Sequence, residues 1–233
     1  MKLFTPVGRR KFFLRLLFLL TGLLFIAAGC IRTSSTNVGT IQDSSAKYYN
    51  LEISIVPANT GTVEASLSGS SFTYGTRITF IPTASAGYEF CRWGISLSPG
   101  SQIVSGGVDS PLKIDMNSNK VITAYFGISP AVAMSMLNSD TTVRLIDVRP
   151  KANYEKEHIP GAISIPFEEI ATSFSEIGSV NSRIIVCSEC YCPDDDEGTF
   201  GAQILLEQGY NNAIELHGGI SGWKDAGYPV TSG

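Results

Sequence analysis

The sequence predicts two domains, a small all-β unit followed by an α/β domain with a central parallel sheet covered by helices on both faces. Residues 48–127 hold short runs of apolar and polar residues in strict alternation, which is typical of half-buried strands. From about residue 128, apolar strands alternate with helical segments. This second rhythm favours a parallel sheet, because a crossover helix must carry the chain back between parallel neighbours.

The first unit contains turn residues between its strands and no stretch of ten residues with helical period. The clearest alternating runs are residues 51–55, 77–81 and 120–126, and the turn clusters are residues 59–61, 68–70, 98–100 and 117–119. We therefore expect a small β domain over residues 48–127.

The second unit opens with Ser129-Pro130, which is typical of a helix cap followed by proline at the first helical position. The expected strands are residues 143–147, 162–166, 183–187 and 213–216, and the later helices are residues 167–173, 199–208 and 219–226. We assign residues 128–233 to this α/β domain.

The first 29 residues have the layout of a secretory signal. A basic head, Arg9-Arg10-Lys11, precedes an apolar run over residues 16–28, which is short for a transmembrane helix. Small residues 27–29 then lead to Cys30 and resemble the lipobox of bacterial lipoproteins. The resemblance implies an exported protein, lipid-anchored through Cys30 to a bacterial membrane on its periplasmic or cell-surface side. An uncleaved anchor is the alternative.

Residues 8–14 also resemble a twin-arginine signal, so the export route stays open between that pathway and general secretion. Residues 30–47 are rich in Ser, Thr and Asn and predict a flexible tether. Removing residues 1–29 takes away five cations and no acid, which changes the formal net charge from −4 to −9. Such an acidic chain argues against a nucleic-acid partner.

Three segments of the β unit resemble a divergent InlB B-type bacterial repeat: residues 75–80, 87–93 and 116–126. The resemblance implies an extracellular spacer or adhesion module without chemistry. Trp93 and Tyr88 are packing residues in this interpretation, and a ligand platform is the alternative. Cys91 lies between aromatic residues and is expected to be a buried thiol.

Cys187 stands where an apolar strand ends and a polar loop begins, ahead of a helix. A thiolate can be stabilised there by loop amides and the helix N-terminus, although the local pattern by itself favours a core cysteine that caps the strand. The segments Leu145-Ile146-Asp147-Val148-Arg149, residues 158–163 and residues 216–230 resemble the signatures of rhodanese-like sulfurtransferases.

This resemblance implies that Cys187 takes up a sulfane sulfur as a persulfide and passes it on. It assigns the backbone cradle of the sulfur to Ser188, Glu189, Cys190, Tyr191 and Cys192. The partners would be a small sulfur donor or a thiol acceptor, a protein thiol included, and no cofactor is implied.

Three further motif residues, Asp147, Arg149 and His158, are expected to hold loops together. A general base is the alternative role for His158.

The loop departs from the family pattern, because Cys192 occupies the place where active members commonly carry arginine. Residues 194–197 are all acidic. Without the arginine the loop lacks a planar donor for oxyanions, and carboxylates repel anionic substrates. Both features argue against thiosulfate turnover and phosphatase chemistry. A solvated acidic loop is the plain alternative.

Two other functions remain open from the sequence. One is a non-catalytic binding module that keeps the fold. The other is a thiol–disulfide element, with a Cys187–Cys192 disulfide or a Cys187 persulfide resolved by Cys190 or Cys192. A metal site would need a fourth ligand beside these three cysteines, so none is expected.

Overall fold

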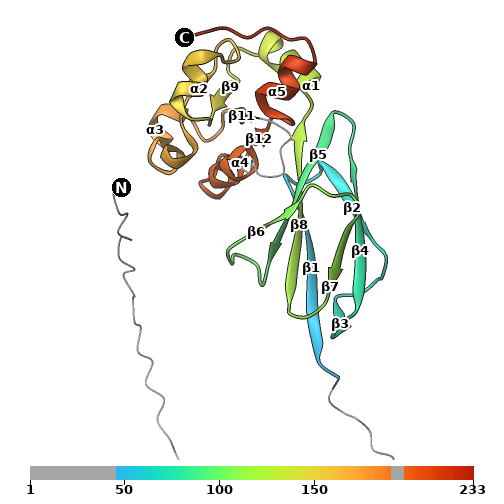
Figure 1. Ribbon diagram of the computed structural model, residues 1–233. Helices are drawn as coiled ribbons and strands as arrows, with labels where there is room; N and C mark the ends of the chain where they lie inside the picture. The colour runs from blue at the N-terminus through green and yellow to red at the C-terminus, as the bar shows by residue number, and fades with distance from the viewer. Residues whose placement is uncertain (1–45, 190–196) are drawn as a thin grey trace, which may run out of the picture. The chain divides into compact units, whose positions relative to one another are not determined.

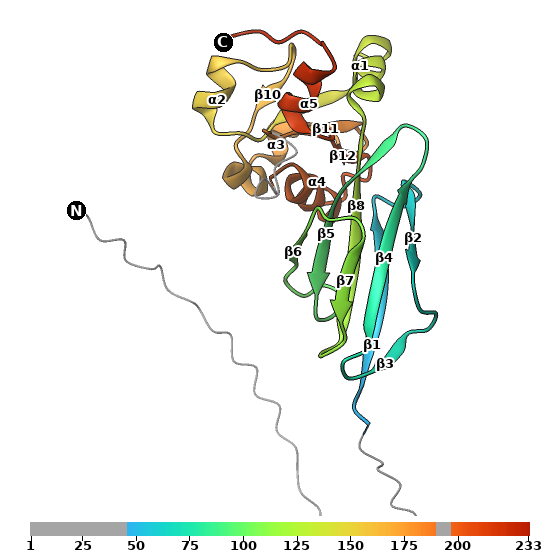
Figure 2. The ribbon, with the colours of Figure 1, turned by 45° about the vertical axis from the view of Figure 1, so that its right-hand side comes forward.

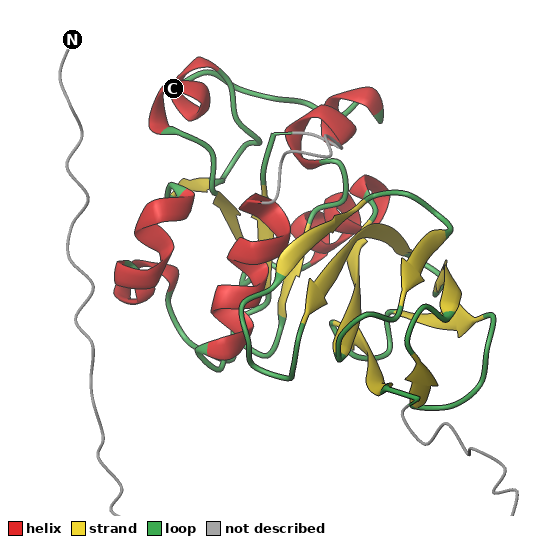
Figure 3. Ribbon diagram, turned by 60° about the horizontal axis from the view of Figure 1, so that its bottom comes forward, coloured by secondary structure: helices red, strands yellow, loops and turns green. Residues whose placement is uncertain are grey.

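The computed structural model describes residues 46–189 and 197–233, which belong to one compact unit. Strands dominate the N-terminal part of these residues, and every helix lies in the C-terminal part (Figure 3). The predicted fold class is therefore confirmed. Among the described residues, no helix is long and apolar enough to span a membrane.

Eight strands form the β part, and they include the three predicted alternating runs. They are β1 (Tyr48–Val56), β2 (Gly61–Ala65), β3 (Ser71–Thr73), β4 (Arg77–Ala84), β5 (Tyr88–Ser96), β6 (Val104–Gly107), β7 (Leu112–Asp115) and β8 (Lys120–Ile128). Five strands pair in the order β3-β1-β8-β5-β6 and three in the order β2-β4-β7. The β1–β8 pair is parallel, whereas the other strand pairs of these two sheets are antiparallel.

The two β-sheets share one apolar core. Ile78 and Phe80 of β4 pack in the same buried cluster as Trp93 of β5 and Phe126 of β8. Trp93 is fully buried, and its indole Nε1–H donates to the carbonyl of Asp109 at 2.9 Å. A side chain placed in this way packs the core and is not available as a ligand platform.

The α/β part has a four-stranded sheet in the order β10-β9-β11-β12, with all strands parallel. Its strands are β9 (Arg144–Asp147), β10 (Ile163–Ser164), β11 (Ile184–Cys187) and β12 (Ala213–Glu215). Its helices are α1 (Pro130–Ser139), α2 (Lys151–Lys156), the 3-10 helix η1 (Phe167–Thr172), α3 (Phe174–Ile177), α4 (Glu197–Glu207) and α5 (Gly219–Asp225).

Helices cover both faces of this sheet because alternate side chains of each strand point to opposite sides. Ile184 and Val186 of β11 belong to a core cluster with residues of η1 and α4. Ile185 and Cys187 belong to a second cluster with residues of α1 and α5. Figure 1 shows these helices around the sheet. The parallel, doubly covered arrangement agrees with the prediction.

The helix boundaries differ from the prediction in several places. Ser129 is the N-cap of α1, as expected, and its hydroxyl accepts from the Val132 amide. Helices α2 and α3 were not predicted, because six and four residues are too few to show a helical period. The predicted helix at 167–173 is a 3-10 helix, and α4 begins at Glu197, two residues before the predicted start.

Strand β8 leads from the β part to the edge of the α/β sheet (Figure 2). Ile128 at its end forms a parallel bridge with Leu216, and the His217 amide donates to the Ile128 carbonyl at 2.9 Å. A Cβ at Gly127 would lie 2.7 Å from the Glu215 carbonyl oxygen. Glycine at 127 therefore permits this close approach of the two segments.

The buried indole of Trp93 leads to a stability prediction. Trp93→Phe removes ring volume from the core and the hydrogen bond to Asp109, so we expect a loss of about 1–3 kcal/mol in the free energy of unfolding. Urea unfolding followed by circular dichroism measures this loss. Tyr74→Phe is the control, because Tyr74 is exposed and its change should be close to zero. Equal midpoints for the two variants would contradict the packing role.

Candidate active site

Cys187 is the last residue of β11, at the carboxyl end of a central strand. It is in register with Asp147 of the neighbouring strand β9, and the Val148 amide donates to the Cys187 carbonyl at 2.9 Å. Ligands of parallel α/β sheets bind at this end of the strands. The structure therefore places the predicted nucleophile at the functional edge of the sheet.

The Cys187 side chain is fully buried among apolar residues. Its thiol lies within hydrogen-bond reach of the Ser188 carbonyl, with Sγ and oxygen 3.5 Å apart. The predicted cradle residues Cys190, Tyr191 and Cys192 lie outside the described residues, as does the predicted lipidation site Cys30. The described part of the cradle consists of Ser188 and Glu189.

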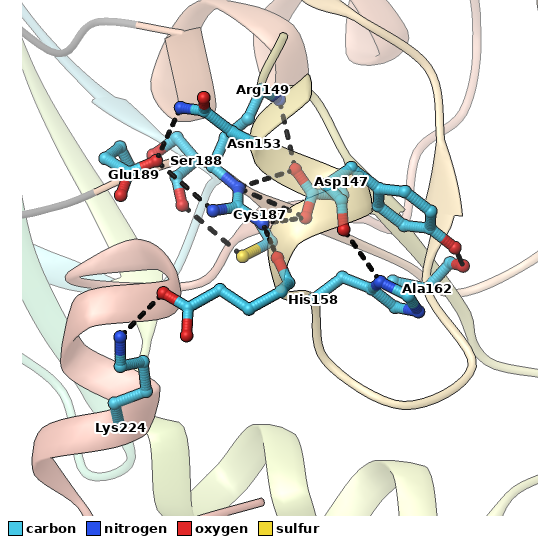
Figure 4. Close-up of polar contacts among 11 residues, drawn as sticks. Asp147, Arg149, Asn153, His158, Ala162, Cys187, Ser188, Glu189 and Lys224 are labelled. Carbon is cyan, nitrogen blue, oxygen red and sulfur yellow. Dashed lines mark hydrogen bonds and ion pairs between the residues drawn. The ribbon is translucent and has the colours of Figure 1, made fainter. Parts of the chain in front are cut away.

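Asp147 and Arg149 form a buried ion pair beside Cys187 (Figure 4). The guanidinium donates from Nε to Asp147 Oδ1 at 2.9 Å and from Nη2 to Oδ2 at 2.8 Å. The Arg149 backbone amide also donates to Asp147 Oδ1 at 3.1 Å. Nη2 further donates to the Glu157 carbonyl at 2.6 Å. These bonds fix the turn that follows β9.

Arg149 also binds the loop that follows Cys187. Its Nη1 donates to Glu189 Oε2 at 3.2 Å, and Asn153 Nδ2 donates to the same oxygen at 3.2 Å. Burial by itself lowers the pKa of the Arg149 guanidinium, but the bonds to Asp147 and Glu189 outweigh it and raise that pKa above its ordinary value. The guanidinium therefore stays charged and is shared between two carboxylates.

The backbone of Ser188 and Glu189 is held by the start of α5. The Ile220 amide donates to the Ser188 carbonyl at 2.9 Å, and the Ser221 amide donates to the Glu189 carbonyl at 3.1 Å. Gly219 has a φ of +56°, and a Cβ there would collide with the Ser188 carbonyl. Glycine at 219 lets α5 approach the loop closely enough for these bonds.

The far end of the loop is held by Glu215 of β12. Thr199 of α4 donates its hydroxyl to Glu215 Oε2 at 2.5 Å. A Cβ at Gly198 would lie 2.8 Å from Ser188 Oγ and 3.0 Å from Glu215 Oε1, so the start of α4 packs closely against both residues. Both ends of the loop are thus anchored to described residues.

A second thiol, Cys91 of β5, lies near the end of β12. Its Sγ is 3.5 Å from His217 Nδ1. Burial and the nearby Glu215 carboxylate raise the pKa of the Cys91 thiol well above its ordinary value. Burial also lowers the pKa of His217, which favours the neutral imidazole. Cys91 is therefore kept as a thiol, and it lacks the low pKa of a reactive cysteine.

His158 has the contacts of a scaffold residue. Its ring stacks on Tyr154 with centroids 3.9 Å apart, and Nδ1 lies 2.9 Å from the Tyr154 carbonyl oxygen. Its backbone amide and carbonyl pair with Thr231, both at 2.8 Å. These contacts hold the C-terminal segment against the turn after α2.

Sequence reasoning missed Asn153, Glu157 and Lys224. Asn153 and Glu157 belong to the unpredicted helix α2 and its C-cap, and Lys224 Nζ lies 2.7 Å from Glu157 Oε1. No spacing in the sequence marks these residues, since each contact joins separate segments. Within the two described ranges, no group of three or more His, Cys, Asp or Glu side chains is placed to hold a metal ion.

The buried pair leads to a second stability prediction. Arg149→Met leaves the buried Asp147 carboxylate without its cation, so we expect the free energy of unfolding to fall by about 3–5 kcal/mol. Arg77→Met is the matched control, because it breaks the exposed Arg77–Asp115 pair at 2.7 Å, which solvent screens, and should leave the free energy of unfolding nearly unchanged. Urea unfolding measures both. Similar losses would show that burial does not govern the Arg149 contribution.

Comparisons with known proteins agree with both parts of the fold. A family model described as a rhodanese-like domain matches residues 129–226, and one described as a divergent InlB B-repeat domain matches residues 51–130. A sulfurtransferase of Allochromatium vinosum is 30% identical over 101 residues, which cover 43% of this chain and 90% of the relative. The thiosulfate sulfurtransferase GlpE of Haemophilus influenzae is 30% identical over 103 residues, which cover 44% of this chain and 91% of the relative.

Other curated relatives are longer proteins. The HTH-type transcriptional regulator Rv0324 of Mycobacterium tuberculosis is 35% identical over 94 residues, which cover 39% of this chain and 38% of the relative. The chain spans 21% and 44% of the length of two further relatives. The match to the shorter sulfurtransferases extends over nearly their whole length, and so the chain belongs to the rhodanese-like family through residues 129–226.

Proposed function

We propose that this protein transfers sulfane sulfur through a persulfide on Cys187. The observation that carries the proposal is the position of Cys187 at the carboxyl end of β11, at the start of the loop that precedes α4. The similarity to sulfurtransferases over residues 129–226 supports the same chemistry. The loop amides would hold the transferred sulfur, as backbone donors hold anions elsewhere.

The transfer takes two displacement steps. Deprotonated Cys187 attacks the outer sulfur of a donor R–S–S⁻ or R–SO₂–S⁻, the S–S bond of the donor breaks, and the leaving group departs with the electron pair. The thiol proton of Cys187 goes to solvent. An acceptor thiolate then attacks the outer sulfur of the Cys187 persulfide and restores the Cys187 thiolate. The complete cycle needs no external oxidant or reductant.

The burial of Cys187 sets a requirement on this mechanism. Sγ has no exposed surface, so a donor reaches it only when the covering segments move apart. Glu189 belongs to the described part of this cover, where Arg149 and Asn153 each donate to its Oε2 at 3.2 Å.

A non-catalytic binding module is the second candidate function, and the complete burial of the thiol favours it. A buried cysteine in apolar surroundings is ordinarily inert. In that case the fold would present a surface to a partner, and Cys187 would contribute only to the core.

We further propose that the protein is exported and anchored by lipid at Cys30. The basic head, the apolar run and the small residues before Cys30 support this. In the bacterial host, the native protein should fractionate with membranes. Cys30→Ser should lose the lipid mass, and it should either appear in the soluble fraction or retain residues 1–29. Cys91→Ser is the control and should stay membrane-bound. Soluble native protein of full sequence mass would overturn the anchor.

The persulfide proposal is tested by intact mass. Reduced protein incubated with a sulfane-sulfur donor should gain the mass of one sulfur atom, about 32 Da, and Cys187→Ser should not. Cys91→Ser should still gain it, because the native Cys91 thiol has a raised pKa and is not expected to take up the sulfur. Ready loss of two protons without a sulfur adduct would instead favour the thiol–disulfide function. If the native protein shows neither the sulfur adduct nor the loss of two protons, the binding module remains as the candidate function.

A further inference from the structure

We propose that Glu189 selects the sulfur donor by charge, so that the site prefers sulfane-sulfur compounds of low net negative charge over dianions such as thiosulfate. This inference rests on the proposed function, and it concerns which donors reach Cys187. It is carried by the arrangement of three charged side chains, Asp147, Arg149 and Glu189, at the start of the loop (Figure 4).

The charges of this group do not cancel. Asp147 and Glu189 carry two carboxylates, whereas Arg149 supplies one guanidinium. The nearby Lys224 ammonium lies 2.7 Å from the Glu157 carboxylate, which compensates its charge. Two negative charges against one positive charge leave the group with an excess negative charge.

The three charged side chains differ in their exposure to an incoming donor. The Arg149 and Asp147 side chains are each 1% exposed, whereas the Glu189 side chain is 47% exposed. Solvent and donors therefore meet the carboxylate of Glu189, and its compensating cation lies behind it. Only Ser188 separates Glu189 from Cys187 along the chain, so this exposed charge lies close to the reacting sulfur.

The position of Glu189 is fixed at both its side chain and its backbone. Arg149 and Asn153 each donate to Oε2 at 3.2 Å, and the Ser221 amide donates to the backbone carbonyl at 3.1 Å. The Ile220 and Ser221 amides of α5 are used for the carbonyls of Ser188 and Glu189. At the described start of the loop, an incoming anion therefore meets the Glu189 carboxylate, and the α5 amides of Ile220 and Ser221 are already occupied by backbone carbonyls.

Three donors with the same reacting bond measure the effect of charge. Thiosulfate is a dianion, ethanethiosulfonate is a monoanion, and 2-aminoethanethiosulfonate is a zwitterion. In each case Cys187 attacks the outer sulfur, the S–S bond breaks, and sulfite or a sulfinate leaves with the electron pair. The donors therefore differ in net charge, while the bond that breaks is of one kind.

The experiment measures the rate of persulfide formation by intact mass for each donor, using the full chain. The native protein should react fastest with the zwitterion and slowest with thiosulfate. Glu189→Gln should raise the thiosulfate-to-zwitterion rate ratio about tenfold, because it removes a charge close to the attacked sulfur. Added salt should narrow the difference between donors in the native protein more than in the variant. The ratio is used because a general change in loop opening affects all donors equally.

Two further variants separate charge from structure. Asn153→Ala removes one hydrogen bond to Glu189 but keeps its charge, so the ratio should remain near the native value. Glu64→Gln removes the same charge from an exposed position on β2 and should leave the ratio unchanged.

The outcomes distinguish this inference from the proposed function. If the native protein forms the Cys187 persulfide with all donors but Glu189→Gln leaves the ratio unchanged, charge selection by Glu189 is wrong and sulfur transfer stands. The same conclusion follows if Asn153→Ala changes the ratio as strongly as Glu189→Gln. If no donor loads Cys187, both the function and the inference fail.

Discussion

The guanidinium of Arg149 is the interaction on which the candidate site depends. Removing a charge from water is costly, and Arg149 is stable in the interior because it is paired with Asp147 and hydrogen-bonded to the carbonyl of Glu157. Through Nη1 the same group reaches Glu189. One buried cation therefore joins the end of β9, the end of α2 and the loop after Cys187.

The parallel sheet decides where this cation can act. Strands β9 and β11 end at the same edge, and their register sets Asp147 beside Cys187. Side-chain alternation then directs Cys187 to the face covered by α1 and α5, together with Ile185. The nucleophile position and the buried ion pair are neighbours because of strand pairing, although Asp147 and Cys187 are 40 positions apart in the sequence.

The β part is attached directly to the sheet that carries the site. The end of β8 pairs with Leu216 just after β12, and Glu215 in β12 binds Thr199 at the start of α4. Cys91 and His217 also meet at this junction. Residues 51–130 match the family model of a divergent InlB B-repeat domain, and here this repeat contacts the strand that anchors the far end of the loop.

The sequence by itself determined the fold class, the order of the main strands and the position of Cys187. Period-two alternation revealed β1, β4 and β8, and the Ser129-Pro130 cap located α1, because these signals depend on near neighbours in the chain. The motif around Asp147 and Arg149 identified both residues as holding loops together, but it did not say which loops.

Only the tertiary structure decided the partners of those residues. The bonds from Arg149 and Asn153 to Glu189 span 40 and 36 positions, and local periodicity contains no record of such contacts. Helix α2 was not predicted because six residues are too few to be stable alone, and it depends on tertiary contacts such as the hydrogen bond from the Tyr154 hydroxyl to the Ala162 carbonyl. The half-exposed charge of Glu189 is likewise a product of folding, since the sequence gives its sign but not its neighbours or its burial.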